Sequence, residues 1–124
     1  MNKLKMSSVL IIVSLLLGLI AGCGGSAQQS TLKVAKLFPM SGDVKTFGVS
    51  SDNGVELAFG EARDEGWDIE TVLGDTKCDA QEAANVANKV INQDKVGFIL
   101  GAVCSSSSIP ISEIANPAGV LQIS

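Results

Sequence analysis

The feature that most constrains the fold is a regular alternation of strand-like and helix-like patterns after residue 31. Apolar runs of strand length occur at Leu32–Phe38, Ile69–Leu73, Val96–Val103 and Gly119–Ile123. The segments between these runs carry apolar residues at helical spacing. Strands that alternate with helices pair in parallel through right-handed crossovers. The sequence therefore predicts an α/β fold, a three-layer αβα Rossmann-like parallel sheet. The run Val96–Val103 is continuous, which is typical of a central strand covered on both faces.

Three segments have the spacing of amphipathic helices. The first runs from Asp52 to Glu65 and ends at Gly66. Its apolar face consists of Val55, Ala58, Phe59 and Ala62. The second helix follows a predicted capping box in Asp79–Glu82. The third has its apolar stripe at Ile111, Ile114, Ala115 and Ala118 and places Pro110 in its first turn, where proline is tolerated.

The first 22 residues have the pattern of an export signal. Lys3 and Lys5 precede the apolar run Val9–Ile20, and small residues follow it. A run of twelve residues is too short to span a bilayer, which takes about 20, so an uncleaved membrane anchor is the weaker alternative. The run ends in "IAGC", which resembles the lipobox of bacterial lipoproteins. That resemblance implies cleavage before Cys23, lipidation of its thiol and a protein exported and anchored to the cell membrane.

These patterns predict three regions. Residues 1–22 are a lipoprotein signal peptide, residues 23–31 are a lipid-anchored tether, and residues 32–124 are a folded α/β lobe. The tether contains "GGSAQQS", a composition typical of a flexible spacer. The sequence ends on a predicted strand with no helix to cover it. We therefore expect the N-terminal part of a longer protein.

Charge and composition exclude several functions. Without Lys3 and Lys5 the chain has seven basic and thirteen acidic residues and no basic cluster, which does not suit nucleic acid. It has no histidine, no G-x-S-x-G motif and no H-E-x-x-H motif. A serine or metal mechanism would have no base and no ligands, so we expect neither an enzyme nor a bound metal or cofactor.

The odd number of cysteines also requires an explanation in an exported protein. Lipidation of Cys23 leaves Cys78 and Cys104, an even pair in an oxidising compartment. A disulfide between these two is favoured, and two free buried thiols are the alternative.

A run of four serines in "GAVCSSSSIP" leads from the third predicted strand into the third helix. In open parallel sheets, ligands bind beyond the carboxyl ends of the strands, where the strand order reverses. The loops at 39–50 and 104–108 have that placement. A helix start offers free amide groups with partial positive charge, which suit a carboxylate, and serine is a favoured N-cap. The alternatives are a flexible linker and a plain helix cap without a ligand.

Three motifs occur together in order: "KVAKLFPMSGDVKTFG", "GDTKCDAQEAANVANKVI" and "VGFILGAVCSSSSIPISEIANPAGVLQIS". The order and spacing of these motifs resemble those of the first lobe of the branched-chain amino acid binding proteins of ABC importers, which have the type I periplasmic binding fold. The resemblance implies a solute-binding protein that holds a small amino-acid-like ligand between two lobes and delivers it to permease subunits. The alternative is a ligand-sensing receptor domain of the same fold.

The resemblance also implies roles for particular residues. Cys78 and Cys104 match a disulfide of the leucine-type receptors. Ser105 matches the serine whose hydroxyl and amide receive the ligand's α-carboxylate, with Val103 and Cys104 contributing backbone and apolar contact beside it. Phe47 falls on the aromatic that shelters the ligand side chain, and Ser106 completes the predicted ligand-binding set. Trp67 is expected to pack locally.

Overall fold

The computed structural model describes residues 30–124. Four strands and three helices alternate along the chain: β1 (Leu32–Phe38), α2 (Lys45–Asp64), β2 (Ile69–Asp75), α3 (Ala80–Asn92), β3 (Phe98–Leu100), α4 (Ser105–Ala115) and β4 (Leu121–Ile123). The predicted signal peptide, the lipidation site Cys23 and residues 23–29 of the tether lie outside the described residues.

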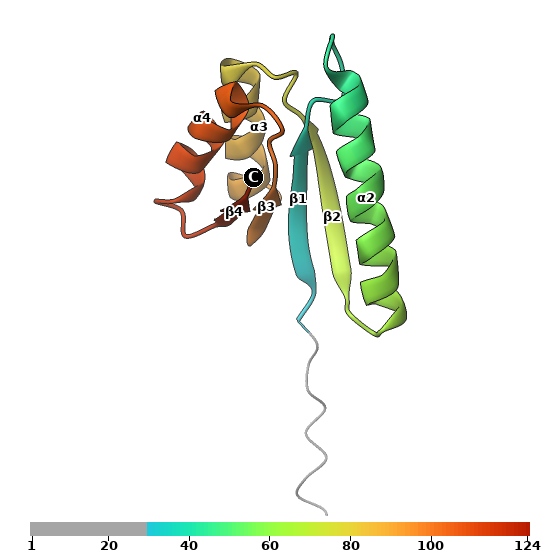
Figure 1. The fold of residues 1–124 in the computed structure, drawn as a ribbon. Helices are drawn as coiled ribbons and strands as arrows, with labels where there is room; N and C mark the ends of the chain where they lie inside the picture. The colour runs from blue at the N-terminus through green and yellow to red at the C-terminus, as the bar shows by residue number, and fades with distance from the viewer. Residues whose placement is uncertain (1–29) are drawn as a thin grey trace, which may run out of the picture.

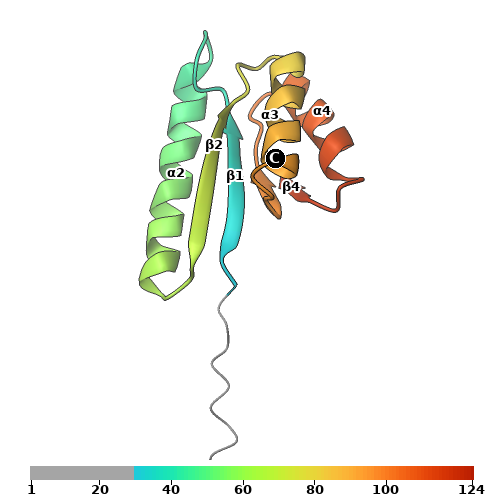
Figure 2. The same ribbon diagram turned by 180° about the vertical axis from the view of Figure 1, so that it is seen from behind.

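The strands form one parallel sheet in the order β2-β1-β3-β4. The first connection moves outward from β1 to β2, and the second moves back past β1 to β3. Right-handed crossovers in opposite directions place their helices on opposite faces of the sheet. Accordingly, α2 lies on one side of the sheet, and α3 and α4 lie on the other (Figure 1). The view from behind shows the same arrangement (Figure 2). The predicted three-layer α/β fold is confirmed.

The main hydrophobic core lies between the sheet and the α3–α4 layer. It is built from alternate strand residues and from the inner faces of the two helices, namely Ala35, Leu37, Ile99, Ala83, Ala87, Val90, Ile111 and Ala115. These side chains are between 0 and 1% exposed. Side chains alternate between the two faces of a strand, so the residues between them in β1 face α2.

The face that carries α2 is covered only in part. Gly48 is the only buried residue of α2, and the predicted apolar stripe of this helix is half-buried or exposed. Phe98 is in register with Val34 of β1 and with Leu121 of β4, on this same face. Phe98 is 38% exposed and Leu121 is 56% exposed. The expectation that 96–103 is covered on both faces is therefore wrong, because α2 lies over β1 and β2 and does not reach β3 and β4.

A buried lysine joins α2 to the sheet. Lys36 of β1 is 4% exposed. Its ammonium group lies 2.6 Å from Asp52 and also donates a hydrogen bond to Glu56, both on α2. Burial works to lower the pKa of Lys36, but the hydrogen bonds to the two carboxylates outweigh it and the pKa is raised. The hydrogen bond from Lys36 lowers the pKa of Glu56. The two carboxylates thus compensate the charge that β1 buries.

This cluster predicts acid-sensitive stability. Because the folded state lowers the pKa of Glu56, its contribution to stability is present above the unfolded pKa of about 4.3 and is lost as the pH falls. Urea unfolding between pH 3 and 7 is expected to show a shallower loss of stability in Glu56→Gln than in the wild type. Glu61→Gln is the control, because Glu61 is exposed and forms no ion pair in the described part of the chain. Equal pH slopes for all three proteins would contradict the prediction.

Two helices begin earlier than the sequence predicts. α2 starts at Lys45 rather than Asp52, although its N-cap Val44 makes no side-chain capping bond. α4 starts at Ser105 with Cys104 as N-cap, again without a side-chain cap, so none of the serines is the N-cap. Pro110 therefore lies inside the helix and not in its first turn. Local capping signals do not decide these starts, since tertiary contacts override weak local propensity.

The predicted start of α3 agrees with the structure. Asp79 is its N-cap, and the carboxylate accepts a hydrogen bond of 2.9 Å from the amide of Glu82. α4 ends at Ala115, so Ala118, which was expected on its apolar stripe, lies beyond the helix and is exposed. Over residues 30–124, no helix has both the length and the apolarity needed to cross a bilayer.

Candidate functional site: the carboxyl edge of the sheet

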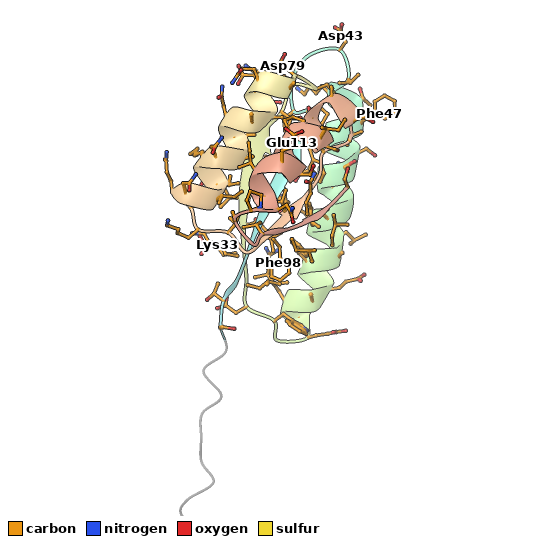
Figure 3. All side chains as sticks on the ribbon, turned by 90° about the vertical axis from the view of Figure 1, so that its left-hand side faces the viewer. Lys33, Asp43, Phe47, Asp79, Phe98 and Glu113 are labelled. Carbon is orange, nitrogen blue, oxygen red and sulfur yellow. A yellow bond between two sulfur atoms is a disulfide. The ribbon has the colours of Figure 1, made fainter. Side chains whose placement is uncertain are left out.

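The candidate site lies where the strand order reverses. β1 and β3 are neighbours in the sheet, but the chain leaves them toward helices on opposite faces. The carboxyl ends of these two strands, where the strand order reverses, are the usual ligand position in such sheets. Figure 3 shows Asp43, Phe47 and Asp79 at this end, while Lys33 and Phe98 lie at the other. The loops at 39–44 and 101–104 follow β1 and β3 at this edge of the sheet.

The first side of the site is the turn from β1 into α2. Phe47 is the third residue of α2 and its side chain is 64% exposed. One residue later, a Cβ on Gly48 would come within 3.0 Å of the carbonyl oxygen of Pro39. Only glycine permits this close approach of the helix to the loop. This close approach fixes the backbone next to Phe47 at the carboxyl edge of the sheet, and the side chain of Phe47 is exposed there.

Asp75, at the end of β2, holds this turn in place. Its carboxylate accepts hydrogen bonds from the amide of Met40 at 2.8 Å, the hydroxyl of Ser41 at 2.6 Å and the amide of Lys77 at 3.0 Å. Partial burial works to raise the pKa of Asp75, but the hydrogen bonds from Ser41, Lys77 and Met40 outweigh it and the pKa is lowered. Sequence reasoning missed this residue. The feature that could have identified Asp75 is a carboxylate at the end of an apolar strand, at the carboxyl edge of the sheet.

The second side of the site is the start of α4, where the four serines differ in their partners. Ser105 is exposed, and neither its hydroxyl nor its amide has a partner in the described part of the chain. The amide of Ser106 is also free, whereas its hydroxyl donates to the carbonyl of Cys78 at 2.8 Å. Ser107 is fully buried. The hydroxyl of Ser108 donates to the carbonyl of Ala102 at 2.8 Å. Ser105 alone keeps both groups available.

The loop before α4 is held from both sides. On the β2 side, Cys78 and Cys104 form a disulfide with a Cα–Cα distance of 5.5 Å, which confirms the expected pairing. On the β4 side, the side-chain amide of Gln122 donates to the carbonyl of Gly101 at 2.8 Å, and the hydroxyl of Ser124 donates to the carbonyl of Ala102 at 2.9 Å. These two β4 contacts could not be predicted from local sequence patterns, because each joins residues about 20 positions apart.

Free hydrogen-bond donors lie next to exposed apolar surface at the start of α4. Free amides at a helix start carry partial positive charge and accept a carboxylate without a cationic side chain. Val103 is 45% exposed and Cys104 is half-buried beside this start. Within residues 30–124, no group of three or more histidine, cysteine, aspartate or glutamate side chains could hold a metal ion. The predicted set of Phe47, Val103, Cys104, Ser105 and Ser106 thus lies at one edge of the sheet.

Trp67 is placed differently from the expectation. It follows Gly66, which has a φ of +98° and turns the chain from α2 into β2. Its side chain is 60% exposed, so the expected local packing is wrong. This turn precedes β2 and therefore lies at the amino edge of the parallel sheet, away from the candidate site at the carboxyl edge.

Comparisons with known proteins agree with this architecture. A family model described as "Periplasmic binding protein" matches residues 31–124. The leucine-, isoleucine-, valine-, threonine- and alanine-binding protein of Pseudomonas aeruginosa is 37% identical over 102 residues, covering 79% of this chain and 27% of that protein. The chain therefore spans about a quarter of the length of this curated relative.

Solved structures show the same fold. The branched-chain amino acid transporter substrate-binding protein LivJ of Streptococcus pneumoniae, in complex with isoleucine, superposes with a TM-score of 0.71 at 30% identity, over 75% of this chain and 28% of that one. A solute-binding protein of an ABC transporter from Rhodopseudomonas palustris, in complex with 3,4-dihydroxybenzoic acid, gives a TM-score of 0.69 at 28% identity, over 74% of this chain and 26% of that one. With its parallel sheet, its reversal of strand order between β1 and β3, and a family match over residues 31–124, the chain belongs to the periplasmic binding protein family.

Proposed function

We propose that the protein carrying this chain is an extracytoplasmic solute-binding lipoprotein of an ABC importer. It holds a branched-chain or related amino acid or amide between two lobes and delivers this solute to permease subunits. The observation that carries the proposal is the start of α4, where the hydroxyl of Ser105 and the amides of Ser105 and Ser106 have no partner among the described residues. Three free donors at a helix start suit a carboxylate.

The ligands named for similar proteins support a carboxylate. The Pseudomonas aeruginosa relative is named for five amino acids. The two solved structures carry isoleucine and 3,4-dihydroxybenzoic acid. These molecules differ in size and in the amino group but share a carboxylate. The shared group supports a site that recognises a carboxylate, which the free donors at Ser105 and Ser106 would suit.

Each predicted site residue has a role in this proposal. Ser105 binds the carboxylate through its hydroxyl and its amide, and Ser106 contributes its amide, because its hydroxyl is bound to Cys78. Val103 and Cys104 supply backbone and apolar contact. Phe47 supplies apolar contact to the ligand side chain. The ligand's ammonium group is expected to bind to residues beyond Ser124 and on the second lobe.

The proposal includes export and anchoring. Residues 1–22 direct secretion and are removed, Cys23 carries the lipid, and residues 23–31 tether the lobe formed by residues 32–124. A protein held by two or more acyl chains stays on the membrane stably. A membrane-spanning segment further along the same reading frame would instead favour the alternative, a receptor domain that senses the ligand.

Ser105→Ala in the full-length protein tests the carboxylate site. Removing the hydroxyl is expected to weaken leucine binding by about 1–3 kcal/mol, roughly ten- to a hundredfold, because one hydrogen bond to a charged group is lost. Isothermal titration calorimetry with leucine measures the change. Ser112→Ala is the matched control, because Ser112 lies two turns further along α4 and its hydroxyl donates to the carbonyl of Ile109 in the same helix. An unchanged dissociation constant in Ser105→Ala would remove Ser105 from the site.

A further inference from the structure

The two sides of the candidate site are not joined directly. In the described part of the chain, no hydrogen bond links residues 39–50 to residues 101–108. One side carries Phe47 and the other carries Ser105, on helices that lie on opposite faces of the sheet. A ligand that touches both requires a fixed separation between them. The pairing of β1 with β3 sets the separation at the strand ends, and a further segment can fix the two loops beyond them.

The segment Asp75–Asp79, between β2 and α3, contacts both sides. At its start, Asp75 accepts the hydrogen bonds from Met40 and Ser41 of the first side. In its middle, Cys78 is bonded through its sulfur to Cys104 and through its carbonyl to the hydroxyl of Ser106. The four residues from Asp75 to Cys78 thus connect the β1–α2 turn to the start of α4 through their hydrogen bonds and the disulfide.

The same segment has a constrained backbone. Lys77 and Cys78 have positive φ angles of 51° and 55°, a conformation that non-glycine residues rarely adopt. The third hydrogen bond of Asp75, from the amide of Lys77, fixes this turn. The amide of Thr76 is also held, by the carbonyl of Phe38 at 2.9 Å. These hydrogen bonds hold the segment in one conformation, so the position of Asp75 relative to Cys78 is fixed.

We propose that Asp75 is a positioning residue of the ligand site, whose carboxylate sets the β1–α2 turn, and with it Phe47, at a fixed distance from the carboxylate cradle at Ser105. This inference rests on the proposed function for its ligand. Asp75 itself touches the loop and not the ligand. Its loss moves Phe47 relative to the cradle, while the disulfide keeps the cradle in place.

The expected signature is a change in selectivity. Asp75→Ala in the full-length protein is expected to weaken leucine binding about tenfold or more and alanine binding by no more than about twofold, because the large side chain depends on Phe47 and the small one does not. Asp75→Asn is expected to restore most of the leucine affinity, since an amide oxygen can still accept from Met40 and Lys77. A purely structural role would weaken both probes equally.

Asp43→Ala is the matched control. Asp43 lies on the same turn, is exposed and has no hydrogen bond or ion pair in the described residues, so its removal deletes the same charge without the contacts. Its leucine-to-alanine ratio should equal that of the wild type. Equal losses for leucine and alanine in Asp75→Ala, or the same altered ratio in Asp43→Ala, would overturn the inference.

A second measurement needs no ligand. Amide hydrogen exchange in Asp75→Ala is expected to accelerate about tenfold or more over residues 39–44, with β1 and α3 unchanged, because the amide of Met40 loses its acceptor. Exchange at the wild-type rate would show that Asp75 does not hold the turn. If the wild-type protein bound neither leucine nor alanine, the proposed function would fail, and the exchange rates would still decide the role of Asp75.

Discussion

Gly101→Ala is expected to destabilise the protein by about 4 kcal/mol. The backbone conformation at this position is strained for alanine, and there is no space for its side chain. Its φ is +121°, and a Cβ there would lie less than 3.0 Å from the carbonyl oxygen of Leu37 on β1. The backbone cannot move away freely. The amide of Gly101 donates to Ile123 at 2.8 Å, and its carbonyl accepts from Gln122 at 2.8 Å.

Gly97→Ala is the control for this prediction. Gly97 lies just before β3, has backbone hydrogen bonds to Lys33 and Leu121, and has no atom within 4 Å of an added Cβ. Its substitution is expected to change stability by less than about 1 kcal/mol. Urea unfolding of the two variants measures the difference. Similar midpoints for both would mean that β1 does not approach Gly101 as closely as the structure has it.

Removing the disulfide is expected to have the second largest effect. The bridge joins residues separated by 26 positions, and the chain-entropy relation gives about 3.5 kcal/mol for a loop of this length. The double variant Cys78→Ser/Cys104→Ser is therefore expected to unfold at a clearly lower denaturant concentration. The start of α4 should also loosen, because the disulfide holds its N-cap Cys104 against Cys78, and only the hydrogen bond from Ser106 to Cys78 would remain.

Reduction supplies the matched control. Adding a reductant should lower the stability of the wild type to that of the double variant and leave the double variant unchanged. Reducing the bridge changes no side chain other than the two cysteines, so it separates the cross-link from the serine substitutions. If the oxidised wild type and the double variant unfolded at the same denaturant concentration, the cross-link would make no contribution to stability.

The order of elements and the fold class followed from the sequence because periodicity is a local property. Apolar residues at period two or 3.6 state which face of an element is buried. The N-cap Asp79 was also local, since its acceptor and the amide of Glu82 are three residues apart. The pairing of Cys78 with Cys104 was favoured by the cysteine count, and it is also implied by the resemblance to a known family; the structure confirms it.

Tertiary structure decided where α2 and α4 begin, which serine is free and how the site is held. Gly48 lies against Pro39, Lys36 is buried against Asp52 and Glu56, and Asp75 reaches back to Met40. Identical neighbours in "SSSS" could not be told apart in sequence, yet the hydroxyl of Ser106 bonds to Cys78 and the hydroxyl of Ser105 has no partner in the described chain. The contacts named here join positions 9 to 35 residues apart, and a local sequence pattern does not specify such distant partners.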